Sequence, residues 1–153
     1  MVMVLSEVRA VIEGVPDPEL PMVTIGDLGI LRSVELSGGR VVATITPTYS
    51  GCPALDAIAA DIVTAAGAIG LAAEVRTVLA PPWTTDWITP EGRQKLQDNG
   101  IAPPGPTVLL TIPSCPQCGS VRVREVSHFG STACKALWVC GSCGEPFDQV
   151  KAL

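Results

Sequence analysis

The 153-residue sequence has few aromatic side chains and no long apolar run. Aromatic residues make up 4% of the chain and hydrophobic residues 47%, so a core must be built mostly from Val, Ile, Leu and Ala. A membrane-spanning helix needs roughly 18 consecutive apolar residues, and none is found. The first residues lack the basic leader and cleavage site of a signal peptide. These absences predict a cytoplasmic protein, and its six cysteines are then expected to be metal ligands or reactive thiols rather than disulfides.

The sequence has one histidine, His128, and this scarcity excludes several kinds of catalysis. A helical di-iron site needs paired Glu-x-x-His motifs, and a catalytic thiol needs a nearby histidine base. The nucleotide-binding motifs G-x-G-x-x-G and the P-loop are also missing. His128 stands beside Phe129 and is expected at the surface or in packing rather than in a metal site. The sequence therefore lacks the residues of an oxygenase, and its thiols are those of a metal-handling protein.

Charge is distributed unevenly along the chain. Residues 1–111 carry 6 basic and 12 acidic side chains, whereas residues 112–153 carry 4 basic and 3 acidic ones. The net charges of −6 and +1 support a domain boundary near Ile112. Binding to a phosphate backbone needs a positive surface, so nucleic acid is not an expected partner.

Apolar periodicity predicts an α+β domain over residues 1–102, with the element order α-β-β-α-β-α. Gly14 and Gly70 are expected to end two of the helices, and Thr89 is expected to cap the third. A proline-rich linker is predicted over residues 103–111, and a second, smaller domain over 112–153. The expected helices cover residues 5–14, 53–68 and 90–99, and the expected strands cover 30–36, 41–46 and 74–79.

Two copies of the motif CxxCG give the strongest signal. They place Cys115, Cys118, Cys140 and Cys143 as two pairs, with 21 residues between Cys118 and Cys140. Four thiolates match the tetrahedral coordination of Zn²⁺, and the β-prone segment between the pairs suits a zinc ribbon. Four protein ligands leave no open position, so the zinc is expected to be structural. An iron–sulfur cluster is the alternative that also accepts four cysteines.

Cys52 lies in Thr48-Tyr49-Ser50-Gly51-Cys52-Pro53, between an expected strand and an expected helix. The sequence places it at the helix N-cap, where free N–H groups and the helix dipole would favour a thiolate. Thr48 and Ser50 add hydroxyl groups nearby. Metal or cluster handling fits Cys52 better than hydrolysis, because the only histidine lies in the other domain. Simple packing of a small residue remains the alternative.

Cys134 is surplus to a site with four ligands. It could be a small buried residue of the ribbon, as free cysteines often are. It could also be a thiol activated by the neighbouring Lys135. The residues alone leave both readings open.

Two further groups of side chains lie in expected loops. The carboxylates of Asp17, Glu19 and Asp27 could bind a cation or a partner, or they could cap turns. Trp83 and Trp87 could form a partner surface, or they could cover the core. The sequence does not separate these roles.

Several stretches resemble a known family. Asp17-Pro18-Glu19, Asp27-Leu28-Gly29 and residues 48–53 resemble the small domain of iron–sulfur cluster assembly and carrier proteins. The stretches PPWTTDWIT, FGSTACKAL and EPFD are similar to the D subunits of bacterial phenylacetyl-CoA epoxidase systems. The similarity extends over nearly the whole chain, and it departs at the end, where relatives tend to carry a further cysteine.

The resemblance implies a non-catalytic accessory protein of aerobic phenylacetate breakdown. Its partners would be the oxygenase and reductase subunits, whose metal centres it would help to mature, and it could form a homodimer. A stable structural subunit and a nucleic-acid-binding zinc ribbon are the alternative functions. The candidate residues for handling iron or a transient iron–sulfur cluster are Cys52, Thr48, Ser50, Asp27 and Cys134.

Overall fold

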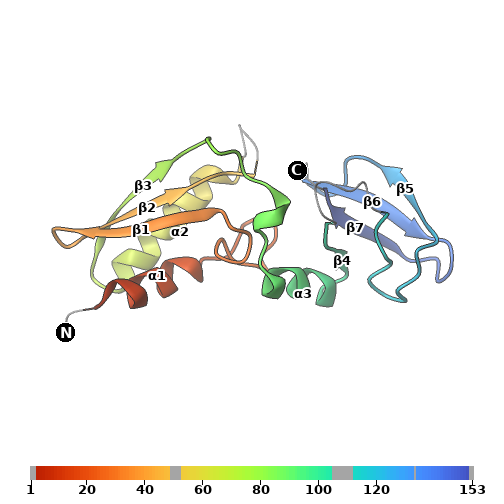
Figure 1. The fold of residues 1–153 in the computed structure, drawn as a ribbon, viewed down its shortest axis with the longest axis horizontal. Coiled ribbons are helices and arrows are strands. Elements are labelled where there is room, and N and C mark those ends of the chain that lie inside the picture. The colour runs from red at the N-terminus through yellow and green to blue at the C-terminus, as the bar shows by residue number, and fades with distance from the viewer. Residues whose placement is uncertain (1–2, 49–52, 105–111, 133, 152–153) are drawn as a thin grey trace. The chain divides into compact units, whose positions relative to one another are not determined.

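The computed structural model describes residues 3–48, 53–104, 112–132 and 134–151. Contacts divide the chain into two compact units, Met1–Trp83 and Thr84–Leu153. Within the described ranges, no helix has the length and apolar character needed to cross a membrane. Helices and strands are both present in the elements of Figure 1, so the predicted α+β class is confirmed.

The elements of the first unit are α1 Leu5–Glu13, β1 Leu31–Ser37, β2 Arg40–Ile45, α2 Leu55–Ala68 and β3 Ala72–Thr77. Those of the second are the 3₁₀ helix η1 Thr85–Trp87, α3 Pro90–Asp98, β4 Ile101–Ala102, β5 Val123–Ser127, β6 Lys135–Cys140 and β7 Pro146–Val150.

The first unit is built on a three-stranded sheet in the order β1-β2-β3 (Figure 1). β1 and β2 form an antiparallel hairpin, and Gly38 and Gly39 have positive φ angles of 58° and 76° in its turn. β2 and β3 are parallel and are connected through α2. α1 packs against β1 and α2, and α2 packs against β3, so both helices cover the same face of the sheet.

The core of the first unit follows the expected periodicities. Ile58, Ile62 and Ala66 are four residues apart on α2 and are buried, as are Val8 and Ile12 on α1. Alternate residues of β2 supply the sheet side of this core. These residues are Val41, Ala43 and Ile45, each with no exposed surface.

The segment between α1 and β1 is packed like core rather than like a surface loop. Val15, Leu20, Val23, Ile25, Leu28 and Ile30 are all buried. Backbone hydrogen bonds hold the segment, among them Asp17 N to Val23 O at 3.0 Å and Ile25 N to Val15 O at 2.8 Å. This packing fixes the two acidic motifs of the segment in place.

The second unit contains a four-stranded sheet in the order β4-β7-β6-β5. β5, β6 and β7 are antiparallel, and β4 adds to β7 in parallel through the pairs Ile101–Asp148 and Ala102–Gln149. The Thr89 hydroxyl accepts a 3.0 Å hydrogen bond from Gly92 N, which confirms the predicted cap of α3.

The boundary between the two compact units lies between Trp83 and Thr84, earlier in the chain than the predicted linker. Contacts place α3 and β4 with the ribbon strands, whereas the sequence grouped the third helix with the first domain. Most of the predicted linker, residues 105–111, lies outside the described residues. The predicted extents 1–102, 103–111 and 112–153 stay a prediction.

Candidate functional site

The four cysteines of the two CxxCG motifs come together in the second unit. The Sγ atoms of Cys115, Cys118, Cys140 and Cys143 all lie within 4.8 Å of one another. Cys115 and Cys143 are 3.7 Å apart, and Cys118 and Cys140 are 3.6 Å apart. A tetrahedron with zinc–sulfur bonds of about 2.3 Å has edges of about 3.8 Å. The thiol positions therefore fit a single Zn²⁺ ion.

The two cysteine pairs sit on turns of the same design. Gly119 N donates to Cys115 O at 2.8 Å, and Gly144 N donates to Cys140 O at 3.0 Å. The glycines have φ angles of 77° and 79°, which side chains rarely allow. The last glycine of each CxxCG motif is therefore required by the turn.

The backbone prepares Cys140 to act as a thiolate. The N–H groups of Cys143 and Ser142 lie 3.4 Å and 3.3 Å from its sulfur. These donors, with that of Cys143 first, lower the pKa of the Cys140 thiol to about 6.

Cys143 shows the opposite shift. The backbone N–H of Glu145 acts to lower its pKa, but burial and the surrounding thiols outweigh this effect and raise the pKa of Cys143 to about 12. Four thiolates without a cation would repel one another. A divalent ion removes this repulsion and would be held by all four sulfurs.

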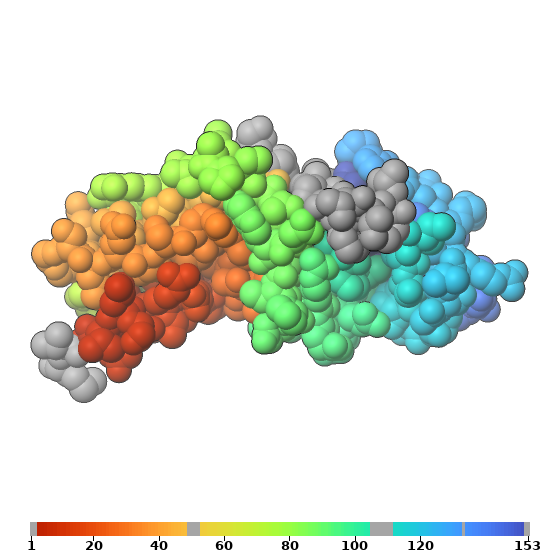
Figure 2. Space-filling model, in the orientation of Figure 1, coloured from red at the N-terminus to blue at the C-terminus, as the bar shows by residue number. Residues whose placement is uncertain are grey.

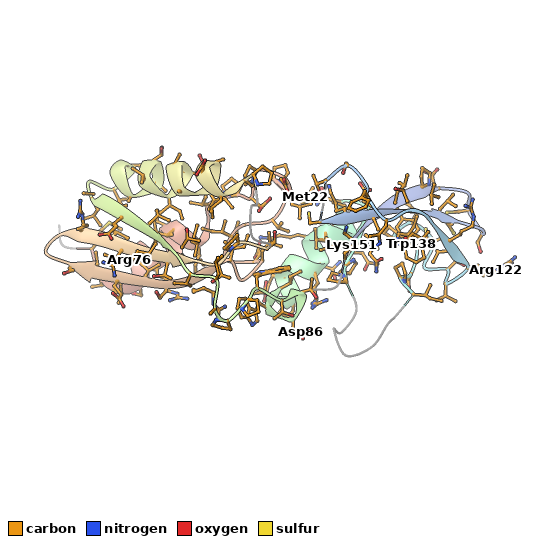
Figure 3. All side chains as sticks on the ribbon, turned by 90° about the horizontal axis from the view of Figure 1, so that it is seen from above. Met22, Arg76, Asp86, Arg122, Trp138 and Lys151 are labelled. Carbon is orange, nitrogen blue, oxygen red and sulfur yellow. The ribbon has the colours of Figure 1, made fainter. Side chains whose placement is uncertain are left out.

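Two members of the metal group, which is the set of four clustered cysteines, also form part of the core of the second unit. Cys115 and Cys140 are buried with Ala102 of β4 and Phe147 of β7, and Trp138 of β6 packs against them. Figure 3 shows Trp138 within the side chains of this sheet. Zinc bound here would join the two turns to the sheet and to β4, which agrees with the predicted structural role.

Cys134 and His128 are not members of this metal group. The Cys134 sulfur is half-buried and lies 3.0 Å from the Thr132 hydroxyl. His128 is exposed, with Nδ1 at 3.5 Å from Glu125 and its ring edge-on to Phe129. The expectation that His128 serves surface packing agrees with these contacts.

In the first unit, two of the predicted carboxylates order turns. Asp17 is buried, and its Oδ1 accepts hydrogen bonds of 2.8 Å from the N–H groups of both Glu19 and Leu20. Asp27 Oδ2 accepts from Thr24 N, and the Thr24 hydroxyl accepts from Asp27 N, both at 3.0 Å. A further role of Asp27 in iron handling stays a prediction.

Several chain segments meet where β2 and β3 end. Thr46 N donates to Ile30 O at 2.9 Å, and Val78 N donates to Ile45 O at 2.9 Å. The indole of Trp83 is buried and donates a 2.8 Å hydrogen bond to Leu28 O. Trp83 therefore covers the core rather than forming a partner surface, and Trp87 is half-buried. These segments therefore meet at the carboxyl end of the parallel pair of β2 and β3.

The helix cap predicted for Cys52 lies elsewhere. α2 begins at Leu55 and its N-cap residue is Ala54, two positions after Cys52. The sequence placed the cap too early because Pro53, a common first helical residue, belongs here to the preceding turn. Cys52 and Ser50 lie outside the described residues, and Thr48 is half-buried after β2. Their roles in iron handling stay predictions.

Comparison with known proteins finds a matching family model for a stretch of each unit. Residues 5–79 match the family described as iron–sulfur cluster assembly protein, and residues 110–151 match the PaaD zinc beta ribbon domain. A protein of Escherichia coli K12, named as the D subunit of a "Putative 1,2-phenylacetyl-CoA epoxidase", is 45% identical over 97% of this chain and 93% of its own. The chain belongs to this family of epoxidase D subunits.

Solved structures resemble part of this D-subunit chain. A domain of unknown function, DUF59, from Bacillus anthracis has a TM-score of 0.56 and 29% identity, covering 60% of this chain and 90% of its own. A conserved hypothetical protein from Thermotoga maritima has a TM-score of 0.51 and 27% identity, covering 61% of this chain and 94% of its own. The resemblance stated from the sequence is confirmed by the 45% identical relative and the two family matches.

Proposed function

We propose that this chain is a non-catalytic maturation factor for a multicomponent 1,2-phenylacetyl-CoA epoxidase. It would act in the cytoplasm and pass iron or an iron–sulfur cluster to the oxygenase or reductase subunits. The observation that carries the proposal is the match of residues 5–79 to iron–sulfur cluster assembly proteins, within a chain similar to an epoxidase D subunit.

Cys52 is the thiol proposed to hold the iron or the cluster. In the second unit, the four ribbon cysteines have the spacing of a closed zinc site, which leaves no position for cargo. Cys52 is the one cysteine of the first unit's sequence. Clusters of this kind take four ligands, so one thiol per chain would need further ligands from a second copy or from the client. Of these two sources, the proposal takes the second copy, so that the loaded form is a homodimer.

The ribbon is proposed to dock the client protein. β5 is an edge strand of its sheet, so one of its sides is not paired with another described strand. Large apolar side chains in and near β5 are exposed: Val121 at 67%, Val126 at 51% and Phe129 at 68%. β5 and the residues leading into it reach the surface in Figure 2. Exposed apolar side chains on and beside an edge strand suit contact with another protein better than contact with nucleic acid.

The test measures iron, zinc and acid-labile sulfide per chain after purification without oxygen. Wild type, Cys52→Ser and the control Cys134→Ser are compared. We expect one zinc in all three proteins, with iron and sulfide in wild type and Cys134→Ser but not in Cys52→Ser. Equal iron in wild type and Cys52→Ser would contradict cargo binding at Cys52.

A stable structural subunit is the second candidate, and the same exposed side chains of the ribbon favour it. Size-exclusion chromatography of the co-expressed epoxidase subunits separates the two functions. A maturation factor leaves the complex after the metal centres are loaded, whereas a structural subunit stays at fixed stoichiometry. Persistent co-elution with the loaded oxygenase would favour the structural role.

A further inference from the structure

Two arginines of the ribbon carry positive charges that no described acidic side chain neutralises. Arg122 and Arg124 are exposed, and neither forms an ion pair with a described residue. Exposed basic side chains of the first unit differ, as in the 2.6 Å pair of Arg9 with Glu13. The two guanidinium groups of the ribbon are therefore available to an acidic group from another molecule.

The second cysteine turn holds the backbone of Arg122. Gly141 N donates to Arg122 O at 2.7 Å, and Arg122 N donates to Ser120 Oγ at 3.1 Å. Ser120 Oγ in turn lies 2.8 Å from Ser142 Oγ. Gly141 and Ser142 lie inside the second CxxCG motif, so a metal ion that fixes this turn also fixes Arg122. Figure 3 shows the Arg122 side chain reaching outward from this end of the ribbon.

The surface of β5 combines basic and apolar side chains. Val123 packs against the core that contains two of the clustered cysteines, and side chains alternate along a strand, so Arg124 faces away from that core. Val126, two positions further on, is 51% exposed. The acidic residue of β5 is Glu125, which stands at the alternate position and lies 3.5 Å from His128 Nδ1. The side of β5 turned away from the core is therefore basic.

Phe129 is an exposed aromatic ring whose position is fixed by its neighbours. The Lys151 ammonium lies 4.5 Å from the ring centre, and the His128 ring stands edge-on at 5.5 Å. The Ser127 hydroxyl donates to Phe129 O at 2.8 Å and accepts from Phe129 N at 3.2 Å. The ring is nevertheless 68% exposed. An aromatic side chain that is already held loses little freedom on binding and suits an anchor of a protein interface.

We infer that Arg122, Arg124, Val126 and Phe129 form a docking surface for an acidic segment of the client protein. Carboxylates of the segment pair with the two guanidinium groups, and an apolar side chain of the segment packs beside the Phe129 ring. This inference rests on the proposed function, and it names the chemistry by which the ribbon recognises its client.

Two other occupants fit this surface less well. A nucleic acid would face the exposed apolar side chains of the surface and a chain with a net charge of −5. A second copy of the chain offers acidic side chains that are already engaged, because Glu13 pairs with Arg9 and Glu74 pairs with Arg76. A separate acidic protein meets neither obstacle.

The experiment measures binding of the full-length, zinc-loaded chain to immobilised oxygenase and reductase subunits of the epoxidase by biolayer interferometry. Wild type is compared with Arg122→Glu/Arg124→Glu and with Phe129→Ala. The matched control Arg9→Glu/Arg76→Glu changes the net charge by the same amount on exposed sites of the first unit. Zinc analysis of every variant shows whether the ribbon is intact.

We expect the reversal of Arg122 and Arg124 to raise the Kd about tenfold or more and to remove most of its dependence on salt between about 50 and 300 mM. Phe129→Ala should raise the Kd about tenfold at both salt concentrations, because it removes an apolar contact. The control should bind within about twofold of wild type, and all variants should hold one zinc.

Every other outcome counts against a stated claim. Wild-type affinity after reversal of Arg122 and Arg124 would overturn the inference and leave the proposed function intact, since the arginines would then only keep the strand edge from pairing with other chains. Equal weakening by the control would overturn it as well, because net charge alone would govern binding. Self-association of wild type that the reversal abolishes, measured by sedimentation velocity, would replace the client by a second copy. Tighter binding to a DNA duplex than to the subunits would replace it by nucleic acid. Failure of wild type to bind any epoxidase subunit would refute the proposed function itself, and the inference with it.

Discussion

The indole N–H of Trp83 donates a 2.8 Å hydrogen bond to the carbonyl oxygen of Leu28, 55 positions earlier in the chain. Both residues are buried. The bond ties the segment after β3 to the turn that carries Asp27, so two stretches that are distant in sequence hold each other in place.

Replacing Trp83 with Phe should lower the stability of the first unit by about 1–3 kcal/mol beyond the cost of the smaller ring, because Leu28 O loses its donor. Urea unfolding measures the change. Trp138→Phe is the matched control, since the Trp138 N–H is buried without a partner among the described residues and its removal sacrifices no bond. Equal losses for the two variants would show that the Trp83 hydrogen bond contributes nothing.

The zinc site should be lost when a buried ligand is removed. Cys115→Ser leaves three thiolates and is expected to abolish zinc binding and the protection of β5, β6 and β7 against hydrogen exchange. Metal analysis and exchange mass spectrometry measure both effects. Cys134→Ser should keep one zinc, because Cys134 lies outside the metal group. A full zinc complement in Cys115→Ser would contradict the assigned ligands.

Gly26 is expected to tolerate no side chain. A Cβ atom there would lie 2.9 Å from Glu13 Cβ and 3.0 Å from Glu13 O, closer than real contacts allow. Gly26→Ala should therefore destabilise the first unit by about 1–3 kcal/mol in thermal or urea unfolding.

The control for Gly26 is Gly67 in α2, where an added Cβ would meet nothing within 4 Å. Gly67→Ala should stabilise the protein by about 0.5–1 kcal/mol, because alanine favours the helix. If Gly26→Ala stabilises the protein as Gly67→Ala is expected to do, the close approach of Gly26 to Glu13 does not exclude a side chain at this position.

Asp17 is expected to contribute more to the free energy of unfolding than an ordinary surface carboxylate does. Asp17→Ala removes the acceptor for the N–H groups of Glu19 and Leu20 and is expected to lower the free energy of unfolding by about 1–2 kcal/mol. Asp17→Asn keeps an oxygen acceptor and should lose less. Wild-type stability of Asp17→Ala in urea would show that the turn orders itself.

The sequence predicted the four-cysteine group well because ligand spacing on tight turns is a local property. It also predicted the hairpin and a helix over residues 53–68. The structure has this helix over Leu55–Ala68, and its apolar residues repeat at the period of one buried face. β4 was missed because a strand of two residues has no periodicity, and its pairing with Asp148 and Gln149 is set by distant packing.

Other features of the candidate site could not be predicted for the same reason. The cap of α2 depends on whether the Pro53 turn joins the helix, and sequence preference allows both. The Thr46 hydroxyl is buried without a hydrogen-bond partner among the described residues, and nothing in the sequence distinguishes Thr46 from other threonines of a strand. Its isolation arises only once Ile30 and the segments around it are packed.

The pairing of β4 with β7 has a consequence for the order of events during synthesis. Ile101 and Ala102 leave the ribosome long before Asp148 and Gln149, with which they pair. Residues 3–83 contain a complete core and can fold while translation continues, but the ribbon sheet cannot close until residue 150 has emerged. All four thiolates are available to zinc only after Cys143 has emerged, and until then the nascent chain holds its first cysteine pair without the second.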